Sequence, residues 1–583
     1  MGMFDATLEI LSQMQNISGL SASDQQMIQE KRKTLPGLVR GVSDIWSRLS
    51  GKGELPGQDL HALYEVMHQS GAGTVTPFYN LMQGLDLPVA EGVLSPEELC
   101  QWGIELDRMS PRVPGTTSMD DTVRYLVDKL ASFGAEVWEE PLTFRGVFFH
   151  EWSFEIVSPV ERTFACFPEN NVGFGDITAP LVDIGRGGES DYEGKDVNGK
   201  IVFVDWGELW DHEGPCAMRE RYGLLHLYDL AFVHGAAGMV GYFSDTPGNA
   251  LKLVEPGIKP TGGSNVRGQS ETGKHRQYKL PVLNIGHDDG LRIRTLLKRG
   301  ELQVHLAVKG VRKVSTTQLV VGFIPGRTST TIACGAHSCT AFEGAVCDTV
   351  GVVGTLALAK YFGSRPIGER RKSMLFFFDS FHVWGNCCQA AVTLLNRRKS
   401  LVPRIDTLLW LDHISDGNAN SPRMAITSDN PVLWPLVALS MAKRGIPPMA
   451  MPIARIWSVC ATGAFERRGI PTMTVQAMNE MTLTTEDTWD KFDPAVVYRD
   501  VMLHIELAQA LHAVTVPLDT PGEPIGGCGA LFTETETPVY PAEERYIPEE
   551  AYPLYVGGGH TPVTVLKTKA EKQAFIGIKH QSD

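Results

Sequence analysis

One stretch of the sequence, residues 331–354, constrains the fold more than any other. It has the sequence TIACGAHSCTAFEGAVCDTVGVVG, so an apolar run ends at His337 and a Gly344-Ala345 turn leads into a segment of small residues. The run is typical of a buried strand, and the segment after the turn is typical of a helix. Ligands and metals bind at the carboxyl ends of strands in an open α/β sheet. The stretch therefore predicts an α/β fold with His337 at a site-forming strand end.

Similar apolar runs recur along the chain between residues 318 and 514, and they alternate with helical patterns. This alternation is the pattern of an α/β domain. Chemically capable side chains follow two more of these runs, at Asp379 with His382 and at Asp412 with His413. We therefore expect three strand ends to contribute to one site. The predicted strands are 318–323, 331–336, 374–379, 406–412 and 472–476.

Several short motifs occur in an order that resembles the M28 family of zinc aminopeptidases. Besides the stretch around His337, they are the turn at 112–115, the Phe-x-x-x-Gly-Ile-Pro segment at 465–471 and the segment 485–493. The resemblance covers roughly residues 97–514. It implies a phosphorylase/hydrolase-like mixed sheet flanked by helices.

Residues 165–310 form a β-rich insertion in this pattern, and they resemble the protease-associated (PA) domain that M28 proteins often carry. The segments at 180–185, 191–202, 234–240 and 281–286 carry that likeness. The expected organisation has four parts: a helical N-terminal region at 1–95, an M28-like α/β domain at 96–164 and 311–514, the PA-like insertion at 165–310, and a C-terminal extension at 515–583.

The resemblance implies five ligand positions around two zinc ions that share a bridging carboxylate and a water. His337 retains the first position and Asp412 the fourth. Cys347 stands where the family has its bridging aspartate, and Asp348 follows one residue later. The sequence leaves open which of these two residues occupies the bridging position.

The remaining positions depart further from the family pattern. The family has a Glu-Glu pair, a general base followed by a ligand, where this chain has Asp379 and Ser380. Leu483 stands where the last histidine ligand is expected. A serine hydroxyl and an alkyl chain are not zinc ligands at neutral pH. A two-zinc site is therefore not expected.

One zinc or other divalent metal can still be held by His337, Asp412 and either Cys347 or Asp348, and His382 and His413 are near enough in the sequence to substitute. A cysteine ligand favours zinc or another thiophilic metal. His337 and Cys347 also have a purely structural interpretation, as a relic histidine and a small core residue.

Two functional hypotheses follow. The first is an M28-like hydrolase with a remodelled site that acts on a small amide or peptide-like substrate. Asp379 would be its general base, or Cys347 its nucleophile with a nearby histidine such as His382. The second is a catalytically inactive binding or assembly scaffold, which the apolar Leu483 favours.

The composition of the chain limits the classes of partner that it is expected to bind. The chain has 583 residues, too many for a single core, and its formal charge of −15 argues against nucleic acid or an anionic membrane as the main partner. No uninterrupted apolar run is long enough to span a bilayer. Asp5 and Glu9 are unlike a signal peptide, and the ten cysteines follow no extracellular spacing. We expect a cytoplasmic protein that binds a small-molecule or peptide substrate and forms a homo-oligomer through its N-terminal helices or C-terminal extension.

Overall fold

The computed structural model describes residues 92–519, except 170–171, 208–223, 254–278, 385–388, 451–460 and single positions between 422 and 478, and also the strands Leu554–Val556 and Thr564–Leu566. The predicted N-terminal helices and most of the C-terminal extension lie outside the described residues.

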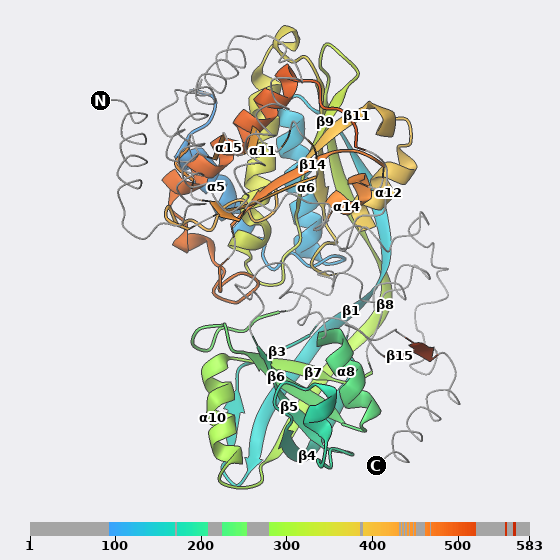
Figure 1. The fold of residues 1–583 in the computed structure, drawn as a ribbon, viewed down its shortest axis with the longest axis vertical. Helices are drawn as coiled ribbons and strands as arrows, with labels where there is room; N and C mark the ends of the chain where they lie inside the picture. Colours follow the sequence, from blue (N-terminus) through green and yellow to red (C-terminus); the bar gives the residue numbers. More distant parts are fainter. Residues whose placement is uncertain are drawn as a thin grey trace, which may run out of the picture.

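The described chain is built on a large mixed sheet whose strand order is β13-β12-β14-β11-β9-β10-β8-β4-β5-β6-β7-β3, with β1 also paired to β8 and β2 paired to β1 (Figure 1). The strands are β1 (Glu136–Ser158), β2 (Arg162–Phe164), β3 (Cys166–Pro168), β4 (Gly175–Asp183), β5 (Ile201–Gly207), β6 (Gly238–Phe243), β7 (Val282–Ile285), β8 (Gln303–Ile324), β9 (Thr331–His337), β10 (Ser373–Asp379), β11 (Ile405–Trp410), β12 (Arg423–Thr427), β13 (Pro448–Ala450) and β14 (Thr472–Gln476).

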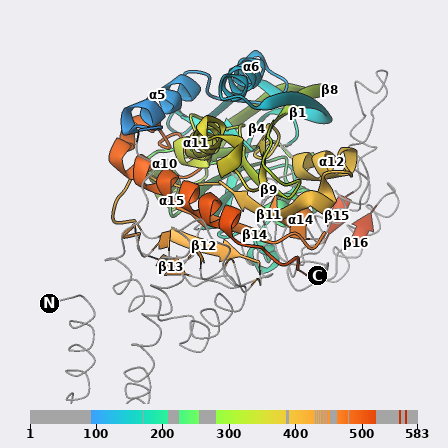
Figure 2. The ribbon, with the colours of Figure 1, turned by 90° about the horizontal axis from the view of Figure 1, so that it is seen from above.

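Helices cover both faces of the part of the sheet that contains β9. One face packs against α5 (Pro96–Asp107), α6 (Thr117–Ser132), α11 (Val350–Ser364) and α15 (Pro494–Ala513), and the other against α12 (Gln389–Arg397) and α14 (Thr462–Glu466), as the view in Figure 2 shows. The helices α8 (Leu224–Val233) and α10 (His287–Leu297) accompany the strands β4 to β7. The predicted α/β class with a mixed sheet flanked by helices is confirmed.

The long strands β1 and β8 join the two parts of the molecule (Figure 1). They pair antiparallel from Glu136↔Phe323 to Ser158↔Gln303. Between them in the sequence lie β2 to β7, α8 and α10, which we call the inserted module. Its strands β4, β5, β6 and β7 run parallel to one another, while β4 is antiparallel to β8 and β7 is antiparallel to β3. The module is thus an α/β layer attached through two continuous strands.

The five predicted strands are all present, with β9, β10 and β14 within one residue of their expected bounds. The predicted strand 406–412 instead ends at Trp410, so Asp412 lies in the following loop. Each face of the sheet packs against its own hydrophobic core. Successive side chains of β10 alternate between the two, with Phe376 in the core on the α11 side and Phe377 in the core on the α12 side. A run buried on both faces is the expected pattern for a central strand.

Helix α11 is the core helix that follows the site segment. A Cβ on Gly351 would lie 2.0 Å from the carbonyl oxygen of Leu411, so only glycine permits this close approach of the helix to the end of β11. Residues 345–364 are long and apolar enough to cross a membrane, but 94% of that span is buried within the fold. Such burial is expected of the central helix of a packed domain.

Acid should destabilise the fold through buried histidines on α15. His504 is fully buried and donates from Nδ1 to the carbonyl of Asp500 at 2.8 Å. Burial lowers its pKa to about 4, so the unfolded chain takes up a proton near pH 6.5 that the folded chain refuses. We expect the free energy of unfolding to fall by about 3 kcal/mol from this group as the pH drops from 7 to 4.

His504→Gln supplies the control, because glutamine can donate the same hydrogen bond without titrating. Its denaturant-measured unfolding free energy should depend less steeply on pH between 7 and 4. Identical pH profiles for the two proteins would contradict the assignment.

Candidate functional site

The predicted catalytic and metal-binding residues meet at the carboxyl ends of β9, β10 and β11. His337 and Asp379 are the last residues of two parallel neighbouring strands and stand opposite each other in register. Asp412 follows β11, which is parallel to β9. The side chains of all three are at most 1% exposed. Parallel strands end at the same edge of a sheet, which is why residues so distant in the sequence come together.

Cys347 and Asp348 reach the same place from the turn before α11, but their side chains make different contacts. The Cys347 Sγ lies 3.5 Å from Nε2 of His337. The Asp348 carboxylate accepts from the backbone N–H groups of His337, Gly351 and His413 at 3.3, 3.0 and 3.1 Å. Asp348 thus joins three segments of the site, while Cys347 presents its thiol to the histidine.

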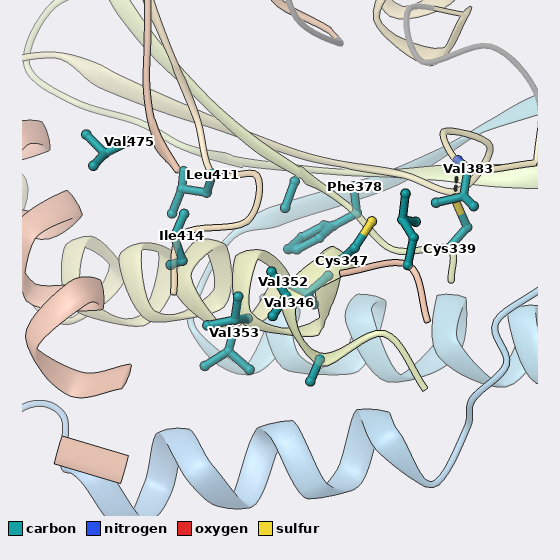
Figure 3. Close-up of a cluster of buried hydrophobic side chains, with 14 of the residues drawn as sticks. Cys339, Val346, Cys347, Val352, Val353, Phe378, Val383, Leu411, Ile414 and Val475 are labelled. Carbon is teal, nitrogen blue, oxygen red and sulfur yellow. Dashed lines mark hydrogen bonds between the residues drawn. The ribbon is translucent and has the colours of Figure 1, made fainter. Parts of the chain in front are cut away.

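The sulfur of Cys347 lies at the border of the hydrophobic core. Cys347 belongs to the same buried cluster as Val346, Val352 and Phe378 (Figure 3). Its backbone N–H, with that of Val346, donates to the carboxylate of Asp487, at 3.2 and 2.7 Å respectively. The segment is therefore fixed from both sides, by apolar packing and by a buried carboxylate.

The hydrogen-bond partner of His337 Nδ1 determines which nitrogen of the ring carries the hydrogen. Nδ1 lies 3.0 Å from the carbonyl oxygen of Cys339, so it must carry a hydrogen and donate. Nε2 then faces both Cys347 Sγ, at 3.5 Å, and Asp412 Oδ1, at 3.4 Å. A catalytic triad uses opposite nitrogens of the imidazole for its nucleophile and its acid. Here both groups share Nε2, so the arrangement is not that of a catalytic triad, and the three atoms Sγ, Nε2 and Oδ1 face one another.

Asp412 is oriented by two neighbours so that one oxygen points into the cluster. Its Oδ2 accepts from Trp410 Nε1 at 3.1 Å and from Gln476 Nε2 at 3.3 Å. Its Oδ1 lies 3.4 Å from Nε2 of His337 and 3.4 Å from Nε2 of His413. Burial alone would raise the pKa of Asp412, but the charges of His413, His337 and His382 outweigh it and hold the pKa well below the ordinary value.

Two groups of ligand atoms lie within 4.8 Å of one another: His337 with Cys347 and His413, and His337 with Asp348 and Asp412. Zinc bonds of about 2.0–2.3 Å in a tetrahedron place neighbouring ligand atoms about 3.3–3.8 Å apart. The three separations at His337 Nε2 and Asp412 Oδ1, at 3.4 to 3.5 Å, fall in that range. Imidazole nitrogen, thiolate sulfur and carboxylate oxygen are all ligand types that zinc accepts.

Ser380 and Leu483 stand at the two positions where the sequence resemblance leads us to expect further ligands. Neither a serine hydroxyl nor an alkyl chain is suited to zinc. Leu483 is 3% exposed and has φ 65, and its carbonyl accepts from Leu253 of the inserted module at 3.0 Å. Among the described residues, this corner of the site is occupied by apolar packing and backbone contacts.

Asp379 and His382 flank the cluster. Asp379 Oδ1 accepts from the backbone of Phe381 at 2.8 Å, and its Oδ2 has no hydrogen-bond partner among the described residues. Burial raises the pKa of Asp379 to about 7; the Phe381 bond opposes this and the charge of Asp412 adds to it. The ring of His382 stacks on that of His337, with centroids 4.3 Å apart and planes at 4°. His382 therefore packs on the face of His337 and does not share its nitrogens.

The sequence had indicated every member of this cluster, including His413, but not the residues that orient them. Gln476 is the last residue of the predicted strand 472–476. Its place at a strand end is the sequence signal that could have identified it as a neighbour of Asp412. The role of Trp410 and of the Cys339 carbonyl depends on side-chain directions that no spacing pattern reveals.

Comparison with known proteins supports the fold. No family model matches this sequence, and neither does any curated protein. Among solved structures, the chain is similar to a peptidase M28 precursor from Shewanella amazonensis SB2B, with a TM-score of 0.59 and 16% identity over 80% of this chain and 99% of that one. It is also similar to a zinc aminopeptidase from Bacillus subtilis, with a TM-score of 0.55 and 15% identity over 77% of this chain and 100% of that one. At such identities the likeness shows the fold alone: the chain has an α/β fold of the kind found in M28 peptidase structures.

Proposed function

We propose that this protein is a hydrolase with a single-metal site that acts on a small amide or peptide-like substrate. One observation carries the proposal. His337 Nε2 lies 3.5 Å from Cys347 Sγ and 3.4 Å from Asp412 Oδ1, and His337 forms one buried group of ligand atoms with Cys347 and His413 and a second with Asp348 and Asp412. The family likeness in the fold, together with the zinc dependence named for the Bacillus subtilis protein, supports the choice of a zinc-like metal.

The chemistry then divides among the residues. A metal ion bound there would supply Lewis-acid polarisation of a carbonyl and a water of lowered pKa. Asp379 takes the proton of the attacking water on Oδ2 as the oxygen bonds to the amide carbon. It returns this proton to the nitrogen as the C–N bond breaks. Asp348 holds the three site segments, and His382 packs against His337 to fix its ring.

The scaffold alternative rests on a specific observation too. None of the cluster residues named above is more than 4% exposed, so the cluster is packed as tightly as a structural core. An inactive protein would keep this packed arrangement without binding metal. The thiol alternative is less well supported, because Cys347 and Asp412 share one nitrogen of His337.

Metal analysis of the purified full-length protein separates these functions. We expect about one zinc per chain, lost in His337→Ala and in Asp412→Ala because each removes a ligand from an already minimal set. His305→Ala is a matched control, since His305 contacts only carboxylates of the inserted module and its neighbouring strand in the described contacts. Protein that never retains metal, even after zinc is supplied, would overturn the proposal.

A further inference from the structure

Arg112 is a fully buried cation outside the cluster that no step above uses. It lies between α5 and α6, far from the strand ends in the sequence, and its exposed fraction is 0%. Arginine is rarely buried without a specific partner, because desolvating its charge is costly. Its contacts therefore indicate what it is for.

The contacts of Arg112 join the two segments that carry His337 and Cys347. Its Nε donates to the carbonyl of Ser338 at 2.7 Å, and its Nη2 donates to the hydroxyl of Thr349 at 2.9 Å. Its backbone exchanges two further bonds with Thr340, at 3.0 and 3.1 Å. Ser338 adjoins His337, and Thr349 is two residues from Cys347. One guanidinium thus spans the gap between the two ligand-bearing segments.

A second set of contacts anchors Arg112 from behind. Its Nη1 donates to the carbonyl of Leu106 at 3.1 Å and to the hydroxyl of Ser110 at 3.0 Å. Leu106 belongs to α5, which is packed against the core. The guanidinium is planar and its donors have a fixed geometry, so anchoring one side sets the position of the other.

The charge of Arg112 is not neutralised by a hydrogen-bonded carboxylate, since all four acceptors of its guanidinium are uncharged. Burial lowers the pKa of Arg112 to about 10, and the charges of Cys339, Asp348, Asp107 and Cys347 oppose that shift. The group is therefore still protonated at neutral pH.

We propose that Arg112 is a positioning residue of the candidate metal site: it sets the separation of His337 from Cys347. The part that concerns metal rests on the function proposed above. The clamp between the two segments does not, and it can be measured without metal.

Cobalt(II) bound to the full-length protein reports the site geometry, because its visible bands and its thiolate charge-transfer band depend on ligand arrangement. In Arg112→Gln we expect at least tenfold weaker cobalt binding and altered bands. Arg112→Lys keeps the charge with fewer fixed donors, so it should recover part of the affinity. Arg423→Gln is the matched control: Arg423 is equally buried but donates to Asp500 and also pairs with Asp416, so its loss should leave the bands unchanged.

The clamp itself is measured on protein stripped of metal, as the rate at which iodoacetamide alkylates Cys347, followed by mass spectrometry. Cys347 is 1% exposed, so alkylation requires the segment to open. We expect Arg112→Gln to raise this rate several-fold and Thr349→Val, which removes one bond of the clamp, to raise it less. If Arg112→Gln does not fold, Thr349→Val alone decides by the same rate.

The outcomes are distinct. A folded Arg112→Gln protein with native cobalt bands, affinity and alkylation rate overturns the positioning role. Wild-type protein that binds no cobalt overturns the proposed function, while the alkylation rates still decide whether Arg112 holds the two segments together.

Discussion

Asp379→Asn is expected to lower kcat for an aminoacyl p-nitroanilide by about 10²- to 10⁴-fold, the usual contribution of a positioned general base, without changing the metal content. Asparagine is nearly the same size and can keep the bond from Phe381, but it cannot accept the proton of the attacking water. Asp379 Oδ2 has no hydrogen-bond partner among the described residues, so it is available for that proton. Steady-state kinetics with parallel metal analysis checks both parts.

The pH dependence of the wild-type reaction gives the same assignment independently. Burial raises the pKa of Asp379 to about 7, and a general base works only when deprotonated. The kcat/KM should therefore rise with pH through about 7 and level off above it. Asp379→Asn should lose this acidic limb along with its activity.

Ser380→Ala is the matched control for Asp379→Asn. Ser380 follows Asp379 directly and is equally buried. Its neutral hydroxyl is no zinc ligand, so its loss should leave metal content and kcat nearly unchanged. Equal losses from the two variants would contradict a specific role for Asp379 and indicate disruption of the loop.

Cys347→Ser is expected to weaken zinc binding by more than about 100-fold. Loss of a residue that only hydrogen-bonds a metal ligand typically weakens binding by roughly 10- to 100-fold, and loss of the ligand itself should cost more. The serine hydroxyl remains protonated at neutral pH, whereas a thiol deprotonates readily beside a metal. The exchange also removes the soft ligand, so a preference for cadmium over zinc should disappear. Competitive metal titrations measure both effects.

Cys347→Asp completes that test, because a carboxylate can bind metal but is hard. It should bind one zinc again with little preference for cadmium, since Ser380 and Leu483 still leave no ligands for a second ion. A Cys347→Ser protein that keeps its metal but loses all turnover would contradict the ligand role and favour thiol chemistry instead.

Most of the fold could be predicted from the sequence because its signals are local. Strands buried on both faces, such as Met374 to Phe378, are continuous apolar runs, and glycines mark the turns between elements. The convergence of His337, Asp379 and Asp412 was expected because residues at the ends of parallel strands share one edge of the sheet. Cys347 and Asp348 were indicated instead by the resemblance to the M28 motif.

The arrangement within the site could not be predicted, because it depends on side-chain directions. Cys347 and Asp348 are adjacent in the sequence, but their side chains make different contacts. The Cys347 thiol faces His337, whereas the Asp348 carboxylate accepts hydrogen bonds from three backbone N–H groups. In the sequence, the turn motif at 112–115 indicates only the fold. Its arginine proved to contact both ligand-bearing segments.

The most direct test of the single-metal account is X-ray absorption at the zinc edge of the loaded full-length protein. We predict one sulfur at about 2.3 Å with nitrogen and oxygen neighbours at about 2.0–2.2 Å, and no second metal in the range of about 3.5–4 Å. A spectrum without sulfur, or one with a metal neighbour at that distance, would contradict a mononuclear site with Cys347 as a ligand.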